Sequence, residues 1–415
     1  MRRTYLYAAM NEDAAQRRRW RAPDHYPPPI EAVSQGNSWF DKLTMTVKNQ
    51  WVSRHPERFE GCMLIATQSH RRVRLISLSP AKRDFLRSRQ DRNTLMWEVL
   101  KTAQAVSKKS RLVKIDQQAL VNFSEKLSAE KIAVPSWNDF YHFYGTKEET
   151  IAYLLILDSI NFCFWPALGN PKWEFDYQSE KLSGYFALAA SLKKALESGI
   201  PLTNAQYLAE LSPKEFKKIL GGTGDLQLLK FRVRSLNELG RLLIRDYRGQ
   251  AYAFVEAAAQ SALKLARLLA EKLPSFRDTA EYHGKKVFFY KRAQLFAADL
   301  YGTLQGKGLG SFHDLDQLTA FADYKVPQVL RHLRVIRYEK ALAQKIDLHI
   351  LLDAGSPEEV EIRANTIWVV ERIRQELLAR GKNLKAMEID WILWNLGQQD
   401  AYRVHPYHRT LTIFY

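Results

Sequence analysis

A carboxylate set among aromatic and apolar residues is the first candidate for chemistry in this sequence. Asp323 lies in FADYKVPQVLRHL (321–333), between Phe321 and Tyr324, with Lys325 as the only charge close by. A carboxylate with limited solvation can stabilise or covalently trap an oxocarbenium-like sugar, the species through which a glycosidic bond breaks. A surface turn before the following proline explains the same residues about as well, so other parts of the chain must decide.

A basic pair is the second candidate. Lys291 and Arg292 begin a predicted helix in YKRAQLFAADLYGTL (290–304). Cations at the start of a helix oppose its macrodipole, so this position favours an external anion or a carboxylate as their partner. A lysine brought next to Asp323 across two helices would form an arrangement able to cleave a glycosidic bond. Two solvated basic residues are the alternative.

A third candidate is a polar pair within the most apolar stretch, TIAYLLILDSINFCFWPAL (150–168). Asp158 and Asn161 are three residues apart and would share one face of a buried helix. A buried aspartate needs a partner or a role, because an unpaired buried charge is costly. Pairing with an arginine would make Asp158 structural, and this alternative stays open.

Two further places combine polar with aromatic groups. Asp390 and Trp394, four apart in EIDWILWNLG (388–397), share a helix face. A carboxylate beside an indole suits a flat, hydrogen-bonding and cationic ligand, although an amphipathic core helix explains the pair as well. His142 lies in the aromatic loop WNDFYHFYG (137–145), where a lone histidine is either a satisfied hydrogen-bonding group or a catalyst.

Common catalytic and cofactor motifs do not occur in the sequence. GGTGDLQ (221–227) and GKGLGS (306–311) lack the residues and the preceding strand of a nucleotide-binding loop. The ten histidines show no helical metal-ligand spacing supported by a third ligand, and there is no Gly-x-Ser-x-Gly motif. The sequence therefore disfavours metal and acyl-transfer chemistry, and we expect neither a metal nor a cofactor.

The charge is unevenly distributed along the 415 residues. The formal net charge is +17, and residues 1–92 contribute about half of it. The weaker positive field of the remaining chain suits a small phosphorylated ligand as well as a nucleic acid. Two cysteines cannot form a disulfide framework, and we find neither a secretory signal nor a membrane span, so we expect a cytoplasmic protein and take a monomer as the default.

Two regions follow from the pattern of residues. Residues 1–92 mix arginine clusters, prolines and serines, and we expect a largely disordered extension, whether a basic tail, an organelle-targeting leader or an over-extended gene model. Residues 93–415 predict one mostly helical domain with a few short strands. The expected strands are 172–177, 285–290 and 409–415, and two long helices are expected at 251–274 and 358–381.

Helix starts carry capping-box signatures, in which a Ser or Thr and an acidic or amide residue three positions on satisfy free N–H groups. The pairs are Thr146 with Glu149, Thr203 with Gln206, Ser212 with Glu215, and Ser356 with Glu359. Pro213 and Pro357 occupy first helical positions. Glu361 and Arg363 are expected to form a charged pair on a buried helix, in a structural role.

Six linked motifs resemble one known family. They are LDSINFCFW (157–165), SGYFAL (183–188), FYKRAQL (289–295), FADYKVPQVL (321–330), EVEIRANTIW (359–368) and IDWILW (389–394). Together they resemble the queuosine salvage protein family, the queuosine 5′-phosphate N-glycosylases that release the base queuine from the nucleotide. The resemblance covers residues 93–415. It implies a helical fold similar to that of helix-hairpin-helix DNA glycosylases and a small-molecule nucleotide as partner.

The resemblance also implies roles for residues. Asp323 would be the nucleophile or the stabiliser of the transition state, and Asp390 and Trp394 would lie in the queuine pocket. His142 matches a base-contacting histidine. We also expect substrate contacts from Asp158 and from the neighbours of Asp323, namely Ala322 and Tyr324. We place Lys291 near the carboxylate or the phosphate, and Lys291 with Arg292 as first candidates for the 5′-phosphate, on grounds of charge alone.

Three functions are therefore candidates for this sequence. The first is hydrolysis of queuosine 5′-monophosphate to queuine, which supplies the base for tRNA modification. The second is a basic helical nucleic-acid-binding protein or a glycosylase acting on a polymer, which would show steep salt dependence. The third is a helical interaction protein, which leaves the carboxylates among aromatic residues unexplained. Whether Asp323 attacks the sugar or positions water stays open, as does the preference for nucleotide over nucleoside.

Overall fold

The computed structural model describes residues 62–65, 74–77, 97–130, 134–135 and 140–415. The chain divides into two compact units, residues 1–91 and 92–415. In the first unit, β1 (Cys62–Ile65) pairs antiparallel with β2 (Arg74–Ser77). The rest of the segment that we expected to be a disordered extension lies outside the described residues, so that expectation stays a prediction.

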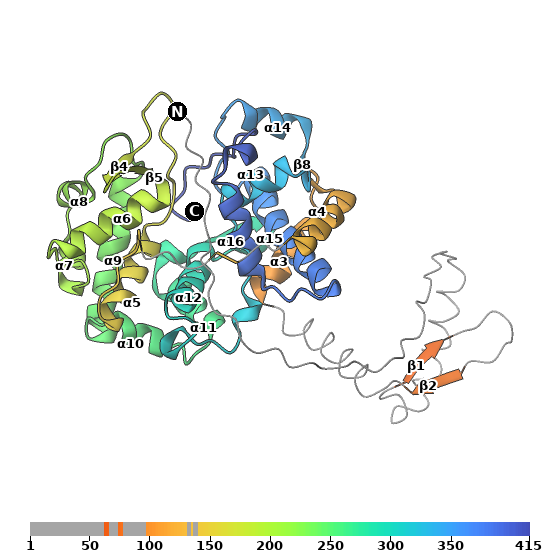
Figure 1. Ribbon diagram of the computed structural model, residues 1–415, viewed down its shortest axis with the longest axis horizontal. Helices are drawn as coiled ribbons and strands as arrows, with labels where there is room; N and C mark the ends of the chain where they lie inside the picture. Colours follow the sequence, from red (N-terminus) through yellow and green to blue (C-terminus); the bar gives the residue numbers. More distant parts are fainter. Residues whose placement is uncertain (1–61, 66–73, 78–96, 131–133, 136–139) are drawn as a thin grey trace, which may run out of the picture. The chain divides into compact units, whose positions relative to one another are not determined.

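The larger unit is mostly helical, as predicted (Figure 1). Its α-helices are α3 (Glu98–Ser107), α4 (Gln117–Ala129), α5 (Lys147–Ser159), α6 (Gly184–Glu197), α7 (Ala205–Glu210), α8 (Pro213–Leu220), α9 (Leu229–Tyr247), α10 (Ala251–Glu256), α11 (Ala262–Lys272), α12 (Lys291–Thr303), α13 (Lys325–His332), α14 (Lys340–Asp347), α15 (Pro357–Ala379) and α16 (Ala386–Leu396). Short 3-10 helices are η2 (Pro274–Phe276), η3 (Gly308–Gly310), η4 (Leu315–Gln317) and η5 (Asp400–Tyr402). No helix in the described part of the chain has the length and apolarity needed to cross a membrane.

The strands form antiparallel pairs and no larger sheet among the described residues. The pairs are β3 (Val113–Ile115) with β8 (Ile336–Tyr338), β4 (Glu174–Tyr177) with β5 (Glu180–Ser183), and β6 (Thr279–Tyr282) with β7 (Lys285–Phe288). Two of the expected strands are confirmed as β4 and β7. The third, 409–415, is wrong: this segment forms only an isolated bridge from Arg409 to Leu351, because no neighbouring strand lies along it.

Several helix boundaries follow the expected caps. The capping box of Thr146 and Glu149 begins α5, Ser212 accepts from the N–H of Glu215 at α8, and Ser356 accepts from Glu359 at α15. One expected cap is wrong, because the side chain of Asn204, not Thr203, accepts the first N–H groups of α7.

The helix expected over 251–274 is interrupted. Helix α10 ends at Glu256, and α11 begins only at Ala262. Ala259 and Gln260 have left-handed backbone conformations, with φ of 51° and 58°, and the Ser261 side chain caps α11. The alanine-rich composition permits a continuous helix, but the serine hydroxyl gives the backbone a competing start point.

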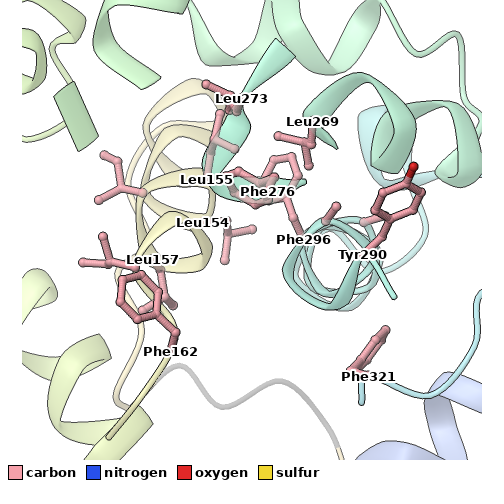
Figure 2. Packing of buried hydrophobic residues seen from close by; sticks show 14 of the residues in the cluster. Leu154, Leu155, Leu157, Phe162, Leu269, Leu273, Phe276, Tyr290, Phe296 and Phe321 are labelled. Atoms are coloured by element: carbon pink, nitrogen blue, oxygen red, sulfur yellow. The ribbon is translucent and has the colours of Figure 1, made fainter. Parts of the chain in front are cut away.

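Two groups of buried apolar residues form the core of the larger unit. One group comes mainly from α3, α5, α6 and α9 to α12, and the other from α4 and α13 to α16. In Figure 1, α6 to α11 lie on one side of this unit and α13 to α16 lie on the other with α4. Figure 2 shows the first group from close by, where Phe296 of α12 faces Leu154 of α5 and Leu269 of α11.

A buried arginine joins segments that are far apart in sequence. The guanidinium of Arg363, on α15, donates to both carboxylate oxygens of Asp278 at 2.9 and 2.6 Å and to Glu359 at 3.3 Å. It also donates to the carbonyl of Ala322 at 3.0 Å and lies over the rings of Phe289 and Tyr415. Arg363 therefore has a structural role, as expected. Its partners are Asp278 and Glu359, while the expected partner Glu361 instead accepts from the backbone N–H groups of residues 111–113.

We predict that Arg363→Met lowers the free energy of unfolding by about 3–5 kcal/mol, because the buried carboxylate of Asp278 would lose its partner. Urea unfolding of the purified variants measures the effect. The control is Arg380→Met, whose ion pairs with Glu376 and Glu125 are partly exposed, and whose cost should be much smaller. An equal cost for both variants would contradict the assigned role of Arg363.

Candidate active site

A cavity of about 1330 Å³ opens in the larger unit, between elements of the two apolar groups. Polar and aromatic residues line it together, and six of the residues expected at a site are among them. These are His142, Lys291, Asp323, Tyr324, Asp390 and Trp394. The other two expected residues, Ala322 and Asp158, lie outside the lining; the carbonyl of Ala322 accepts from Arg363.

Asp323 lies immediately before α13. Its Oδ1 accepts hydrogen bonds from the backbone N–H groups of Lys325 at 2.8 Å and Val326 at 3.0 Å. The first N–H groups of a helix lack partners within the helix and favour a negative charge, so they fix this carboxylate in place. Its second oxygen, Oδ2, has no hydrogen-bond partner among the described residues, and the residue lines the cavity. Asp323 is therefore not part of an exposed turn.

Burial raises the pKa of Asp323, and the charge of Lys291 and the two backbone N–H groups oppose this rise. Lys291 is the first residue of α12 and is only 7% exposed. Its backbone N–H donates to Asp278 at 3.1 Å, but its ammonium group makes no ion pair within 4.0 Å of a carboxylate in the described part of the chain. Burial lowers the pKa of Lys291, while Asp323, Asp158 and Asp390 act to raise it.

Asp390, on α16, connects this helix to the segment before α13. Its Oδ1 accepts from the N–H of Phe321 at 2.9 Å. Burial raises the pKa of Asp390 well above its ordinary value, and the charge of Asp323 raises it further. One turn along, the indole of Trp394 meets the rings of Tyr185 and Phe186 edge-on, with centroids 6.0 and 5.7 Å apart. The carboxylate and the indole share a helix face, as their spacing predicted.

His142 is buried in the cavity wall. Its Nε2 lies 3.0 Å from the hydroxyl of Tyr185, and its ring packs beside those of Tyr153 and Tyr185. This histidine belongs to an aromatic wall that also includes Trp394 and Phe162. Such a wall suits a planar ring.

The expected pair of Asp158 and Asn161 is only partly right. Helix α5 ends at Ser159, so Asn161 lies beyond it and does not share a helix face with Asp158. Its side-chain amide nevertheless donates to Oδ1 of Asp158 at 3.5 Å. Oδ2 of Asp158 is buried without a hydrogen-bond partner among the described residues. Burial raises the pKa of Asp158 to about 7.

Asp299 was missed by the analysis of the sequence. It lies on α12, eight residues after Lys291, lines the cavity and is 3% exposed. Its Oδ2 also has no hydrogen-bond partner in the described part of the chain. Burial and the charge of Asp158 raise its pKa well above the ordinary value. The signal was present in AQLFAADLYG, where Asp299 is an acid inside an apolar helical stretch, as Asp158 is in α5.

Arg292 was expected to bind an anion, and this expectation is wrong. Its guanidinium donates to the carbonyls of Asp158, Ser159 and Ser275 and lies over the rings of Phe162 and Phe276. The side chain is 1% exposed and does not line the cavity. A guanidinium with its donors already used by protein carbonyls has little left for a ligand.

Other basic residues line the cavity instead: Lys172, Lys325, Arg403 and Arg409. Lys172 donates to the hydroxyl of Ser183 at 2.8 Å. Lys325 and Arg403 both donate to the carbonyl of Gly397, at 3.2 and 3.0 Å. Burial and the charge of Arg403 lower the pKa of Lys325 to about 8. Lys172 precedes β4 and Arg403 follows η5, so spacing in the sequence could not predict that they line one cavity.

The cavity therefore combines two chemical environments. A rigid buried carboxylate faces it near a lysine and further acids, and a separate group of cations lines it as well. The first can stabilise positive charge that develops on a sugar, and the second can bind an anionic group. The aromatic wall adds a surface for a planar base.

Comparisons with known proteins agree with this chemistry. The family model "Queuosine salvage protein" matches residues 141–415. A protein from Sphaerobacter thermophilus named queuosine 5′-phosphate N-glycosylase/hydrolase is 46% identical over 317 residues, which are 76% of this chain and 97% of that protein. Proteins of the same name from Mus musculus and Dictyostelium discoideum are 35% and 39% identical, covering 76% of this chain and 97% and 98% of their own lengths.

We predict that Asp158→Asn stabilises the protein increasingly as the pH rises. A pKa of about 7 in the folded state, against an ordinary value of 3.8, stabilises the fold at low pH. That contribution is lost as the pH rises through about 7, whereas the asparagine stays neutral. Urea unfolding should show the stability of the variant gaining about 2–3 kcal/mol relative to wild type between pH 5 and pH 8. The exposed Asp176→Asn is the control, and a pH-independent difference for Asp158→Asn would contradict the argument.

Proposed function

Because the chain belongs to the queuosine salvage protein family, we propose that it hydrolyses the N-glycosidic bond of queuosine 5′-phosphate and releases queuine for salvage. The observation that carries this proposal is the position of Asp323 on the cavity wall. One carboxylate oxygen is held by two helix N–H groups, and the other has no hydrogen-bond partner among the described residues. The names of the relatives supply the substrate.

Asp323 is the group that meets the positive charge developing at C1′ of the ribose. It either bonds to this carbon or stabilises the charge while water attacks, and both routes need the ionised carboxylate. Burial favours the neutral form, and the charge of Lys291 restores part of the ionised form. Queuine is a 7-deazaguanine and lacks the N7 that is protonated in purine leaving groups, so the reaction depends strongly on stabilisation of the sugar.

The base occupies the aromatic wall in this proposal. Trp394 and the ring of Tyr185 offer faces and edges to the deazaguanine, while Asp390 and His142 offer polar groups at the same wall. The carboxylate of Asp390 accepts hydrogen bonds from the guanine-like edge through the oxygen not used by Phe321. We also propose, from the family resemblance, that the fold is similar to that of helix-hairpin-helix DNA glycosylases.

The 5′-phosphate lies among Lys172, Lys325 and Arg403. Lys325 follows Asp323 by two residues, which places a cation close to the sugar, and the exposed side chains of Lys172 and Arg403 complete the group. These three residues replace Arg292, whose Nη atoms donate to carbonyls and which does not line the cavity, as phosphate ligands. Burial and the charges of Arg403 and Lys172 lower the pKa of Lys325, and a dianionic phosphate bound among these cations would oppose that shift.

We predict that Asp323→Asn lowers the release of queuine from queuosine 5′-phosphate by about 10³-fold or more, because the neutral amide cannot stabilise the developing charge. Mass spectrometry of free queuine measures the rate. The variant should remain folded, since the protein already disfavours the charge at this position. Asp176→Asn, at an exposed position of β4, is the control. Equal release by Asp323→Asn and wild type would remove this residue from the mechanism.

We predict that Lys172→Met lowers kcat/KM for queuosine 5′-phosphate about tenfold and leaves kcat/KM for the nucleoside queuosine nearly unchanged, because only the nucleotide carries the phosphate. Steady-state kinetics on both substrates measures the ratio. Lys181→Met is a matched control, since Lys181 is an exposed lysine on β5 that does not line the cavity. A similar loss on nucleotide and nucleoside would place the phosphate elsewhere.

A further inference from the structure

The buried groups around Lys291 do not balance in charge. Four carboxyl groups lie there, from Asp158, Asp299, Asp323 and Asp390, and each is at most 7% exposed. The cations that act on them are Lys291, Arg292 and, for Asp323, Lys325. Four ionised carboxylates would outnumber these cations and leave an excess of negative charge away from water, which is costly. The surplus must be met by bound protons or by a cationic ligand.

Asp299 and Asp158 have no task in the mechanism described above. Asp299 lines the cavity, and Asp158 interacts with it from outside the lining. Each has a buried Oδ2 without a hydrogen-bond partner in the described part of the chain, and so does the hydroxyl of Thr303, one turn after Asp299 on the cavity wall. Buried polar atoms of this kind usually have partners. Three of them in one region indicate a place prepared for a hydrogen-bonding ligand group.

The position of Asp299 separates it from the reacting carbon. It lies eight residues after Lys291 on the same helix, which corresponds to about 12 Å along the helix axis. The two residues therefore face different parts of one ligand. Lys291 acts on Asp323 and, from the far end of this stretch of helix, also on Asp299, so both carboxylates belong to one electrostatically linked cluster.

We propose that Asp299, supported by Asp158, binds the secondary ammonium group in the side arm of queuine. This inference rests on the proposed function and adds to it the group that distinguishes queuine from a plain deazaguanine. A secondary ammonium supplies two N–H donors and one positive charge, so it can pair with the unpaired oxygens and offset the excess negative charge. Together with the cationic sugar facing Asp323, it would offset the excess negative charge of the buried cluster.

Proton linkage gives this proposal a second consequence. The groups that act on the pair are Lys291 and Arg292, with the hydroxyls of Tyr153 and Tyr185 nearby. Near neutral pH the pair of acids holds a proton, because burial raises the pKa of both. An ammonium bound beside them favours the ionised form, so binding releases this proton.

Calorimetric titration of the full-length protein with queuine and with 7-deazaguanine, which lacks the arm, tests the proposal. Wild type should bind queuine about 10- to 100-fold more tightly than 7-deazaguanine. Titration at about pH 6.5 in buffers of different ionisation enthalpy should show proton release with queuine only. Asp299→Asn should lose both the preference and the proton release, while binding 7-deazaguanine as wild type does.

Asp176→Asn is the matched control, because it removes an exposed carboxylate of β4 that does not line the cavity, and it should keep the preference for queuine. Equal binding of the two bases by wild type would overturn the proposal, and so would an Asp299→Asn variant that weakens both equally. If Asp299→Asn does not fold, the wild-type titrations still decide. Failure of the proposed function is separate, since it would appear as no release of queuine from queuosine 5′-phosphate by wild type.

Discussion

The ion pair between Arg363 and Asp278 fixes the geometry of the cavity. Asp278 accepts from the N–H of Lys291 and so determines where α12 begins, while Arg363 holds the carbonyl of Ala322, next to Asp323. One buried pair thereby sets the positions of the lysine and the carboxylate on opposite elements. A buried ion pair contributes little net stability compared with apolar packing. Its role here is to orient the two segments that carry Lys291 and Asp323.

The cavity is built at a cost to stability. Four acids are buried near few cations, and burial raises the pKa of each of them. The packing of the two large groups of buried apolar residues stabilises the fold and offsets this cost. The same desolvation that penalises a charge in the folded protein strengthens its attraction for a cation in the cavity. The cost of burying the four acids and the attraction of the cavity for a cation therefore have a single origin.

Local signals in the sequence predicted much of the frame. Caps such as Thr146 and Ser356 act on N–H groups within one turn, so their pattern was sufficient to place helix starts. Asp323 stood out because its aromatic neighbours and the following helix are adjacent in sequence. Long-range contacts could not be predicted in this way. The partners of Arg363 and Arg292 lie up to 134 residues away, and the strand expected at 409–415 failed for lack of a neighbour.

The separation between Asp278 and Arg363 also has a consequence during synthesis. The two residues are 85 positions apart, so Asp278 leaves the ribosome well before its partner exists. At 5–20 residues per second the delay is roughly 4 to 17 s, which is long compared with the formation of a helix. During that interval α12 can form, but nothing holds its first residue against the segment of Asp323. The nascent chain therefore acquires its helices early and its cavity late.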